Sequence, residues 1–450
     1  MRRRISLNLW WSFLVPVILL ILAILLDRCD TPASTSSSLH FWVRLGSQAF
    51  YTGDTRRAIP LLSLAAAAHD LTPDGWTMLG DAYQDQGDLA DALLAWQNAG
   101  NSAGVIGRRL QVHLGLRDYP SAIKDLQELV TLKPQDAGTL YQLGLLMAAT
   151  QPDQAIVYLY SAASHSFVYS VHANALIQRI QAAQPALQPA YTLLESGRAL
   201  ADLDEWELAA EAFRSATDLR PDYAEAWAFL GEALQHIDVP EGKSFSTNGL
   251  TQLELAKQLD PNSLSANLFL VLYWRRQGQY GRALEILEDL TTLDPQNPVI
   301  QVEMGNTLAE NGNPGAALPY YVRATELAPS DPTYWQALAG FSLSSHYQPR
   351  QVALPASRQL LLLSPDDPAA LDLMGQVLLL LEDPLNAERF IQRAIQINPA
   401  YAPARLHLAQ VYLLRNATMA ARQELEITLT LAPSSPEAEY AKRLLENTLP

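Results

Sequence analysis

Residues 298–331, PVIQVEMGNTLAENGNPGAALPYYVRATELAPSD, decide the fold of this chain. The Asn-Gly-Asn triplet at 311–313 interrupts a helical pattern, and Pro329 ends that pattern because proline cannot continue a helix. Residues that recur at helical spacing on either side of the triplet are small or apolar: Met304, Gly305, Leu308, Ala317, Tyr321 and Ala324. The stretch therefore predicts two short helices folded back on each other.

This unit is repeated along the chain at a fixed period. Its closing prolines recur at one constant spacing in two runs, Pro261, Pro295 and Pro329, then Pro365, Pro399 and Pro433, and Pro134 and Pro221 close earlier units. The first helix carries a glycine at one shared position: Gly46, Gly80, Gly144, Gly197, Gly231, Gly305 and Gly375. The second helix carries an alanine in the same way: Ala58, Ala92, Ala122, Ala209, Ala283, Ala317 and Ala387. Such a repeat predicts a stacked array, which forms long surfaces rather than one deep pocket.

In residue type and spacing, the unit resembles the tetratricopeptide repeat, with a tryptophan position, a Leu-Gly pair, a tyrosine, an alanine and a closing proline. The tryptophan position is filled by Trp42, Trp76, Trp227 and Trp335. About eleven units run from Leu39 to roughly Pro433. The resemblance implies an all-α fold, a right-handed superhelical solenoid of helix-turn-helix repeats, whose concave groove binds other proteins or peptides.

Three departures from the period divide the chain. Residues 238–247 (DVPEGKSFST) insert about six residues between the helices of one unit, which we expect to form a mobile loop. The spacing from Pro329 to Pro365 carries two extra residues, and residues 166–183 predict a helix that fits no repeat. We therefore expect a first array over 39–165, an extra helix and joint over 166–189, a second array over 190–433 and a capping helix over 434–450.

The amino terminus predicts a membrane anchor. Residues 9–26 carry no charge, and 18 helical residues span about 27 Å, close to the roughly 30 Å of hydrocarbon in a bilayer. Arginines lie in the basic tail, residues 1–8, whereas a Ser/Thr-rich linker follows over 27–38. The positive-inside rule then predicts a single-pass protein with a cytoplasmic amino terminus and extracytoplasmic repeats. A cleaved signal peptide is the alternative, but the apolar run is longer than a usual signal core and no Ala-x-Ala site follows it.

Composition excludes some kinds of partner. The chain has 31 Lys and Arg against 47 Asp and Glu, a net charge of −16, which argues against nucleic acid because phosphate binding needs a basic face. Cys29 is the single cysteine, so no internal disulfide can form, and the residues before it do not resemble a bacterial lipobox. The eight histidines are dispersed, and no phosphate loop or nucleophile elbow is present. We therefore expect no catalytic site, no cofactor and no metal, and a small-molecule substrate is not expected.

The concave groove of the second array is expected to combine apolar and amide side chains. By helical spacing and by the resemblance, its candidate residues are Leu268, Leu272, Val302, Asn306, Gln336, Leu343, Gln376, Leu379, Leu406, Gln410 and Leu413. Asn and Gln both donate and accept hydrogen bonds, so the amides could hold the backbone of an extended peptide, although an ordinary solvated surface accounts for them as well. In the first array, Asp74, Asp81 and Asp85 could face a basic partner, although scattered acidic residues are more often an ordinary solvated surface.

Three functions remain open at this stage. The first is a membrane-anchored scaffold that mediates protein–protein interactions on the extracytoplasmic side and contacts the bilayer through residues 9–26. The second is an assembly or secretion cofactor of an envelope enzyme complex, for example in polysaccharide export or protein maturation. The chain resembles bacterial lipopolysaccharide-assembly factors that join an amino-terminal anchor to such repeats, but it lacks their paired cysteines. The third is an enzyme whose site lies in the groove.

Overall fold

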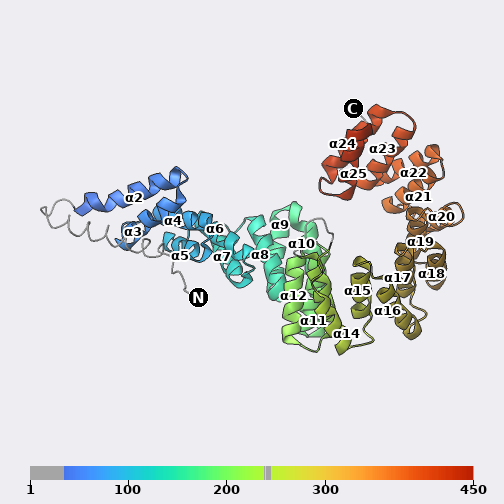
Figure 1. Cartoon of the computed structure of the whole chain (residues 1–450), viewed down its shortest axis with the longest axis horizontal. Helices are drawn as coiled ribbons and strands as arrows, with labels where there is room; N and C mark the ends of the chain where they lie inside the picture. Colours follow the sequence, from blue (N-terminus) through green and yellow to red (C-terminus); the bar gives the residue numbers. More distant parts are fainter. Residues whose placement is uncertain (1–34, 238, 240–244, 449–450) are drawn as a thin grey trace, which may run out of the picture. The chain divides into compact units, whose positions relative to one another are not determined.

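The computed structural model describes residues 35–237, 239 and 245–448 (Figure 1). The described residues form 24 α-helices and two short 3-10 helices, and they contain no β-strand. The all-α class is therefore confirmed, whereas the handedness of the superhelix stays a prediction. The basic tail (1–8) and the predicted anchor (9–26) lie outside the described residues. Within the described part of the chain, no helix is both long enough and apolar enough to cross a membrane.

The chain divides into two compact units between Leu187 and Gln188, inside the joint expected over 166–189. Unit 1 contains four helical hairpins followed by a single helix, α10. Its helices are α2 (Thr35–Tyr51), α3 (Thr55–Ala67), α4 (Pro73–Gln86), α5 (Leu89–Ala99), α6 (Ala103–Gly115), α7 (Tyr119–Leu132), α8 (Ala137–Thr150), α9 (Pro152–His165), α10 (Phe167–Ala183) and η1 (Gln184–Ala186). The first described helix begins at Thr35, so the last four residues of the expected linker belong to it.

Unit 2 contains seven hairpins and a terminal helix. Its helices are α11 (Pro189–Ala201), α12 (Trp206–Leu219), α13 (Ala224–Ala233), η2 (Leu234–His236), α14 (Leu250–Leu259), α15 (Leu264–Arg276), α16 (Tyr280–Leu293), α17 (Pro298–Glu310), α18 (Pro314–Leu327), α19 (Pro332–Ser344), α20 (Ala353–Leu363), α21 (Pro368–Leu380), α22 (Pro384–Ile397), α23 (Ala402–Leu414), α24 (Thr418–Leu431) and α25 (Pro436–Thr448). Each hairpin packs against the next in chain order, which is the arrangement of a solenoid.

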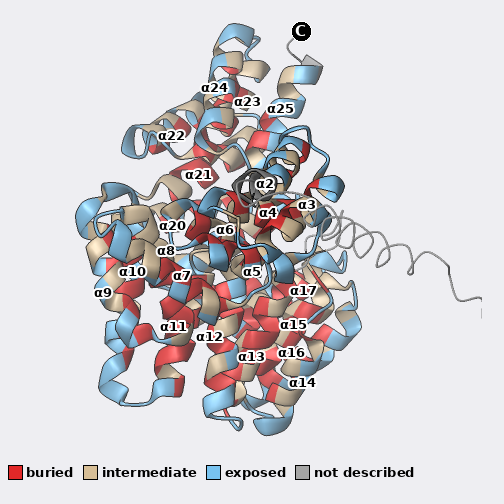
Figure 2. Ribbon diagram, turned by 90° about the vertical axis from the view of Figure 1, so that its left-hand side faces the viewer, coloured by how far each residue is buried: buried red, intermediate tan, exposed pale blue. Residues whose placement is uncertain are grey.

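The shared glycines let the two helices of a hairpin approach each other. A methyl group placed on Gly80 would lie 2.4 Å from the indole nitrogen of Trp96, and one placed on Gly375 would lie 2.3 Å from Ile391. The other five glycines of this set meet a second-helix side chain at 2.5–2.7 Å. The seven alanines of the second helices are all fully buried. Figure 2 shows how buried positions collect on the helix faces that meet, while the connections stay exposed. The prediction that small residues set the helix spacing is therefore confirmed.

The insertion in the α13–α14 hairpin keeps this packing. In the other hairpins with a shared glycine, that glycine is covered by a second-helix residue at nearly the same separation in sequence, as Gly305 is by Tyr321. Gly231 is covered in the same way by Leu253, although the insertion makes the chain between them longer. The far end of the insertion is not free, because Ser246 is buried and its backbone N–H donates to the Gln235 carbonyl at 2.8 Å. The expected mobile loop is therefore held in place at its described end.

Prolines mark both ends of the hairpins. Second helices end two residues before their closing proline, as α16 ends at Leu293 before Pro295 and α24 ends at Leu431 before Pro433. Several first helices begin with proline, whose missing N–H costs nothing in the first turn. The preceding Asp or Asn then caps the helix, and Asp367 accepts a hydrogen bond from the backbone N–H of Ala369 at 3.0 Å. The local sequence thus determines where each helix starts and stops.

Replacing Asp367 by alanine is expected to lower the stability of unit 2 by about 0.5–2 kcal/mol, because an N–H in the first turn of α21 then loses its acceptor. Asp367→Asn keeps the acceptor and serves as the control. Urea unfolding followed by far-UV circular dichroism measures both variants. Equal destabilisation by the two substitutions would show that the cap contributes nothing.

Candidate functional site

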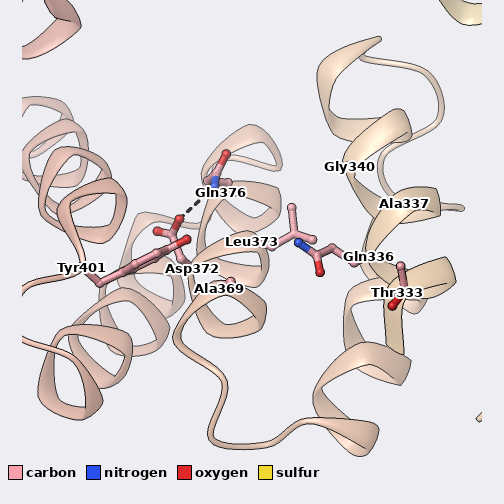
Figure 3. A pocket seen from close by; sticks show the side chains of 9 residues that line it. All are labelled: Thr333, Gln336, Ala337, Gly340, Ala369, Asp372, Leu373, Gln376 and Tyr401. Atoms are coloured by element: carbon pink, nitrogen blue, oxygen red, sulfur yellow. Dashed lines mark hydrogen bonds between the residues drawn. The ribbon is translucent and has the colours of Figure 1, made fainter. Parts of the chain in front are cut away.

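Unit 2 has a hollow of about 480 Å³ on the face formed by its first helices (Figure 3). Helix α19 contributes Gln336 and Gly340 to the lining, and α21 contributes Asp372 and Gln376. Tyr401, which directly precedes α23, lies at one side. Gly340 has no side chain to fill the hollow, and the space beside it is open, because a methyl group on it would meet nothing within 4 Å. The hollow therefore spans three consecutive repeats, and the side-chain amides of Gln336 and Gln376 line it together with Gly340.

The polar side of the hollow is organised around Asp372, which is only 2% exposed. Its two carboxylate oxygens lie 2.8 and 3.0 Å from Nδ1 of His407 on α23, and one of them accepts a hydrogen bond from Nε2 of Gln376 at 3.0 Å. These bonds satisfy a carboxylate that burial would otherwise disfavour, and they join α21 to α23. In Figure 3 the ring of Tyr401 extends toward Asp372.

Tyr401 stays protonated at physiological pH. Burial, together with the negative charges of Asp372, Asp367 and Glu437, raises the pKa of its phenol to about 12. A protonated phenol can donate a hydrogen bond as well as accept one. The hollow therefore offers a neutral donor, primary amides and one carboxylate, and it contains no cationic side chain in its lining.

Unit 1 has a second hollow, of about 590 Å³, lined by residues of α4 and α6 together with Phe50. Asp81 lies in it, but its charge is compensated: Nε and Nη2 of Arg108 bind its two oxygens at 2.7 and 3.2 Å, and the Trp96 indole donates to it at 3.0 Å. Asp85 also lines this hollow, whereas Asp74 does not. The predicted row of three acids therefore provides less free negative charge than the sequence indicates.

Sequence comparison identifies the repeat in three segments. Residues 43–105, 194–236 and 275–340 match profiles of the tetratricopeptide repeat. These segments are tetratricopeptide repeats. No curated protein sequence matches the chain.

Solved structures are similar to the chain only at low sequence identity. Yeast Tom70 is 16% identical, covers 92% of this chain and 98% of its own, and has a TM-score of 0.47. The Cut9–Hcn1 hetero-tetramer of the APC/C is 14% identical over 93% of this chain and 97% of that chain, with a TM-score of 0.41. MamA (residue 41 to the end) from Desulfovibrio magneticus RS-1 is 20% identical over 39% of this chain and 98% of that chain, with a TM-score of 0.33.

The helical hairpins of unit 2 place the predicted groove residues unequally. Gln336 and Gln376 line the hollow, and Gln336 is the more open member of the pair, since its side chain makes no hydrogen bond in the described part of the chain. Most apolar candidates are half-buried and pack against neighbouring hairpins: Leu268, Val302, Leu343, Leu379 and Leu413. Leu272 and Gln410 are also half-buried. Leu406 is only 4% exposed, because it packs with Ala421, Leu425 and Ala441 of the last two helices. Leu406 therefore belongs to the core and not to an open groove.

The amide row is interrupted at Asn306. Its side-chain oxygen accepts a hydrogen bond from the Tyr321 hydroxyl, and its nitrogen donates to Glu303 at 3.2 Å. Glu303 in turn pairs with Arg275 of the preceding repeat at 2.5 Å. Asn306 therefore takes part in a network that joins two repeats, and its amide is already occupied on both sides. Binding by the row remains a prediction for Gln336, Gln376 and Gln410.

The His407–Asp372 pair was not predicted. The two residues are separated by close to one repeat period, so the period itself could have placed them on adjacent first helices. A histidine held by a buried carboxylate also occurs in catalytic sites, where it activates a nucleophile. In this structure the pair joins α21 to α23 and so bonds two neighbouring repeats.

Proposed function

We propose that the protein is a membrane-anchored scaffold whose unit 2 binds an extended segment of another protein in the hollow between α19, α21 and Tyr401. Tetratricopeptide repeats form scaffolds for protein–protein interactions, and this fold supports that general role. The observation that carries the specific proposal is the hollow itself, because three repeats contribute hydrogen-bonding groups to one open surface. Residues 9–26 support the anchor by their length and lack of charge.

The chemistry of the lining favours a peptide backbone. Gln336 makes no side-chain hydrogen bond among the described residues, so both its carbonyl and its NH₂ group are available. Tyr401 adds a neutral hydroxyl, and Gly340 lets a chain approach closely. Asp372 is the single charged residue in the lining, and because it is buried and already bonded to His407 and Gln376, the exposed groups available to a ligand are uncharged.

A photo-crosslinking amino acid at Gln336, in the full chain expressed in its native membranes, is expected to capture a partner protein. The control is the same amino acid at Leu362 on α20, which is 76% exposed and belongs to the same hairpin. Capture at Gln336 that is lost in a Gln376→Ala background, with none at Leu362, would support the proposal. Equal capture at both positions, or none at Gln336, would refute it.

The identity of the crosslinked products separates the two roles that the sequence left open. A single stable product would indicate a dedicated assembly cofactor, whereas several products would indicate a general scaffold. Protease added outside intact spheroplasts tests the topology separately. Digestion of the repeats is expected, and protection that ends only on lysis would place the repeats in the cytoplasm.

A further inference from the structure

The side-chain amide of Gln376 is fixed in one orientation in the hollow of unit 2. Its Nε2 donates to a carboxylate oxygen of Asp372 at 3.0 Å, and a carboxylate can only accept hydrogen bonds. Figure 3 shows the amide nitrogen turned toward Asp372 and the amide oxygen turned away from it. Because Gln376 lines the hollow, the place occupied by its Oε1 is an acceptor site for a ligand.

The neighbouring repeat prevents this amide from turning over. Asp372 is held on its other side by His407 of α23, whose Nδ1 lies 2.8 and 3.0 Å from the two carboxylate oxygens. If the amide of Gln376 turned over, its oxygen would face the oxygen of Asp372, and two acceptors would meet at a buried position. The orientation of one exposed amide is therefore determined by a contact between two repeats.

The other polar groups of the hollow have no fixed polarity. Gln336 makes no side-chain hydrogen bond in the described part of the chain, so its amide can turn either way. The protonated hydroxyl of Tyr401 can donate or accept. An extended polypeptide presents one N–H and one C=O per residue, and these two groups can bind either of them. Only Oε1 of Gln376 then distinguishes the N–H groups of a bound segment from its carbonyls.

We propose that Asp372 is a positioning residue that fixes Gln376 as an acceptor, so that the hollow selects segments with a backbone N–H opposite Gln376. This inference rests on the proposed function and names the chemistry of the partner. Its residue at that place is not proline, which has no backbone N–H. A segment shifted so that a carbonyl faces Gln376 would leave two acceptors unsatisfied. Gln376 therefore sets the register in which a partner binds.

An amide-to-ester scan tests this requirement. The probe is a fluorescent synthetic peptide with the sequence of the segment crosslinked at Gln336, and each derivative replaces one backbone N–H by an ester oxygen, which removes the donor without adding bulk. Fluorescence anisotropy with the full chain in detergent measures the affinity. We expect the ester at one position to weaken binding by roughly tenfold or more, because two oxygens then face each other at Gln376. Esters at the other positions are the controls and are expected to cost less.

Asp372→Asn separates positioning from a purely structural role. Asparagine has the same size and can still bond to His407, but its side chain can donate to Gln376 as well as accept. Gln376 is then free to turn its NH₂ group to the ester, so the cost at the sensitive position is expected to fall to that at the other positions. Asp372→Ser, whose hydroxyl also donates and accepts, is a second variant with the same expected result. A structural defect would instead weaken all peptides alike.

Gln376→Met removes the acceptor itself and is also expected to abolish the position-specific cost. Gln396→Met is the matched control, because Gln396 is exposed on α22 and does not line the hollow. Equal ester costs at all positions, or a full cost that persists in both Asp372 variants, would overturn this inference and leave the proposed function in place. If no segment is captured at Gln336, the proposed function fails, and the inference fails with it.

Discussion

Replacing Arg276 by methionine is expected to destabilise unit 2 by about 3–5 kcal/mol, because it leaves Glu232 buried without its charged partner. Arg276 binds both oxygens of Glu232, at 2.8 and 2.9 Å, and donates to Gln235 at 3.0 Å. Glu232 is only 8% exposed. The guanidinium also lies 3.9 Å from the ring centre of Phe245, so the same substitution releases the end of the insertion. Urea unfolding of the full chain measures the loss.

The matched control is the double variant Glu232→Gln with Arg276→Met. Once the carboxylate is removed, no buried charge is left unpaired, so most of the lost stability is expected to return. His236 and Gln235 can still hydrogen-bond to the new amide, since both now bond to Glu232 at 3.2 and 3.0 Å. If the single variant is as stable as the double, the charge pair is not what holds α13 to α15.

The same pair predicts how stability depends on pH. Burial alone raises the pKa of Glu232, but hydrogen bonds from His236 and Arg276, together with their charges, hold it below its usual value of 4.5. The folded state therefore binds this proton less readily than the unfolded chain does. Stability from this group is fully present above pH 4.5 and is lost as the pH falls through the lower folded pKa. Glu232→Gln with Arg276→Met is expected to remove this part of the acid sensitivity.

Replacing Gly80 by alanine is expected to destabilise unit 1 by about 1–3 kcal/mol. The added methyl group would lie 2.4 Å from the Trp96 indole nitrogen, and Trp96 is fully buried, so the ring cannot move away without displacing its neighbours. The shift would also strain the hydrogen bond from that nitrogen to Asp81, which is now 3.0 Å. The midpoint of urea unfolding, followed by tryptophan fluorescence, measures the effect.

Gly107 on α6 provides a control with the opposite sign. A methyl group there meets nothing within 4 Å, so Gly107→Ala is expected to stabilise the helix by roughly 0.5–1 kcal/mol through the lower conformational freedom of the unfolded chain. The two substitutions are chemically identical, and only the packing differs. Destabilisation of equal size at both positions would contradict the view that the shared glycines are spacers.

The hairpins were predictable because each one is specified by short-range rules. Gly305 and Tyr321 lie in one unit, and the closing proline follows the end of the second helix by two residues, so a single repeat specifies the packing and the end of its own hairpin. The extra residues before Gly249 were visible as a break in the period. The period does not predict which contacts are made by residues outside the shared positions. Phe245 in the insertion is one such residue, since nothing local requires its ring to lie under Arg276.

The groove was harder to predict because its residues interact across repeats. Leu406 was expected in the groove by its position in the helix, but α24 and α25 supply the side chains that bury it. The same helix position can therefore be exposed on the concave face in a middle repeat and buried near the end of the array. Asn306 differs for another reason: its hydrogen bonds to Tyr321 and Glu303 depend on which residues happen to occupy neighbouring first and second helices.

The α13–α14 hairpin has a practical use in protein engineering. Its helices meet at Gly231 and Leu253 although their connection is longer than the usual one. The carboxyl end of that connection is held by the contact of Phe245 with Arg276 and by the burial of Ser246. Foreign sequence placed upstream of these two residues would leave both interactions intact. An epitope tag or a small fluorescent domain inserted between residues 239 and 245 would therefore report on the protein in living cells with its remaining repeats unaltered.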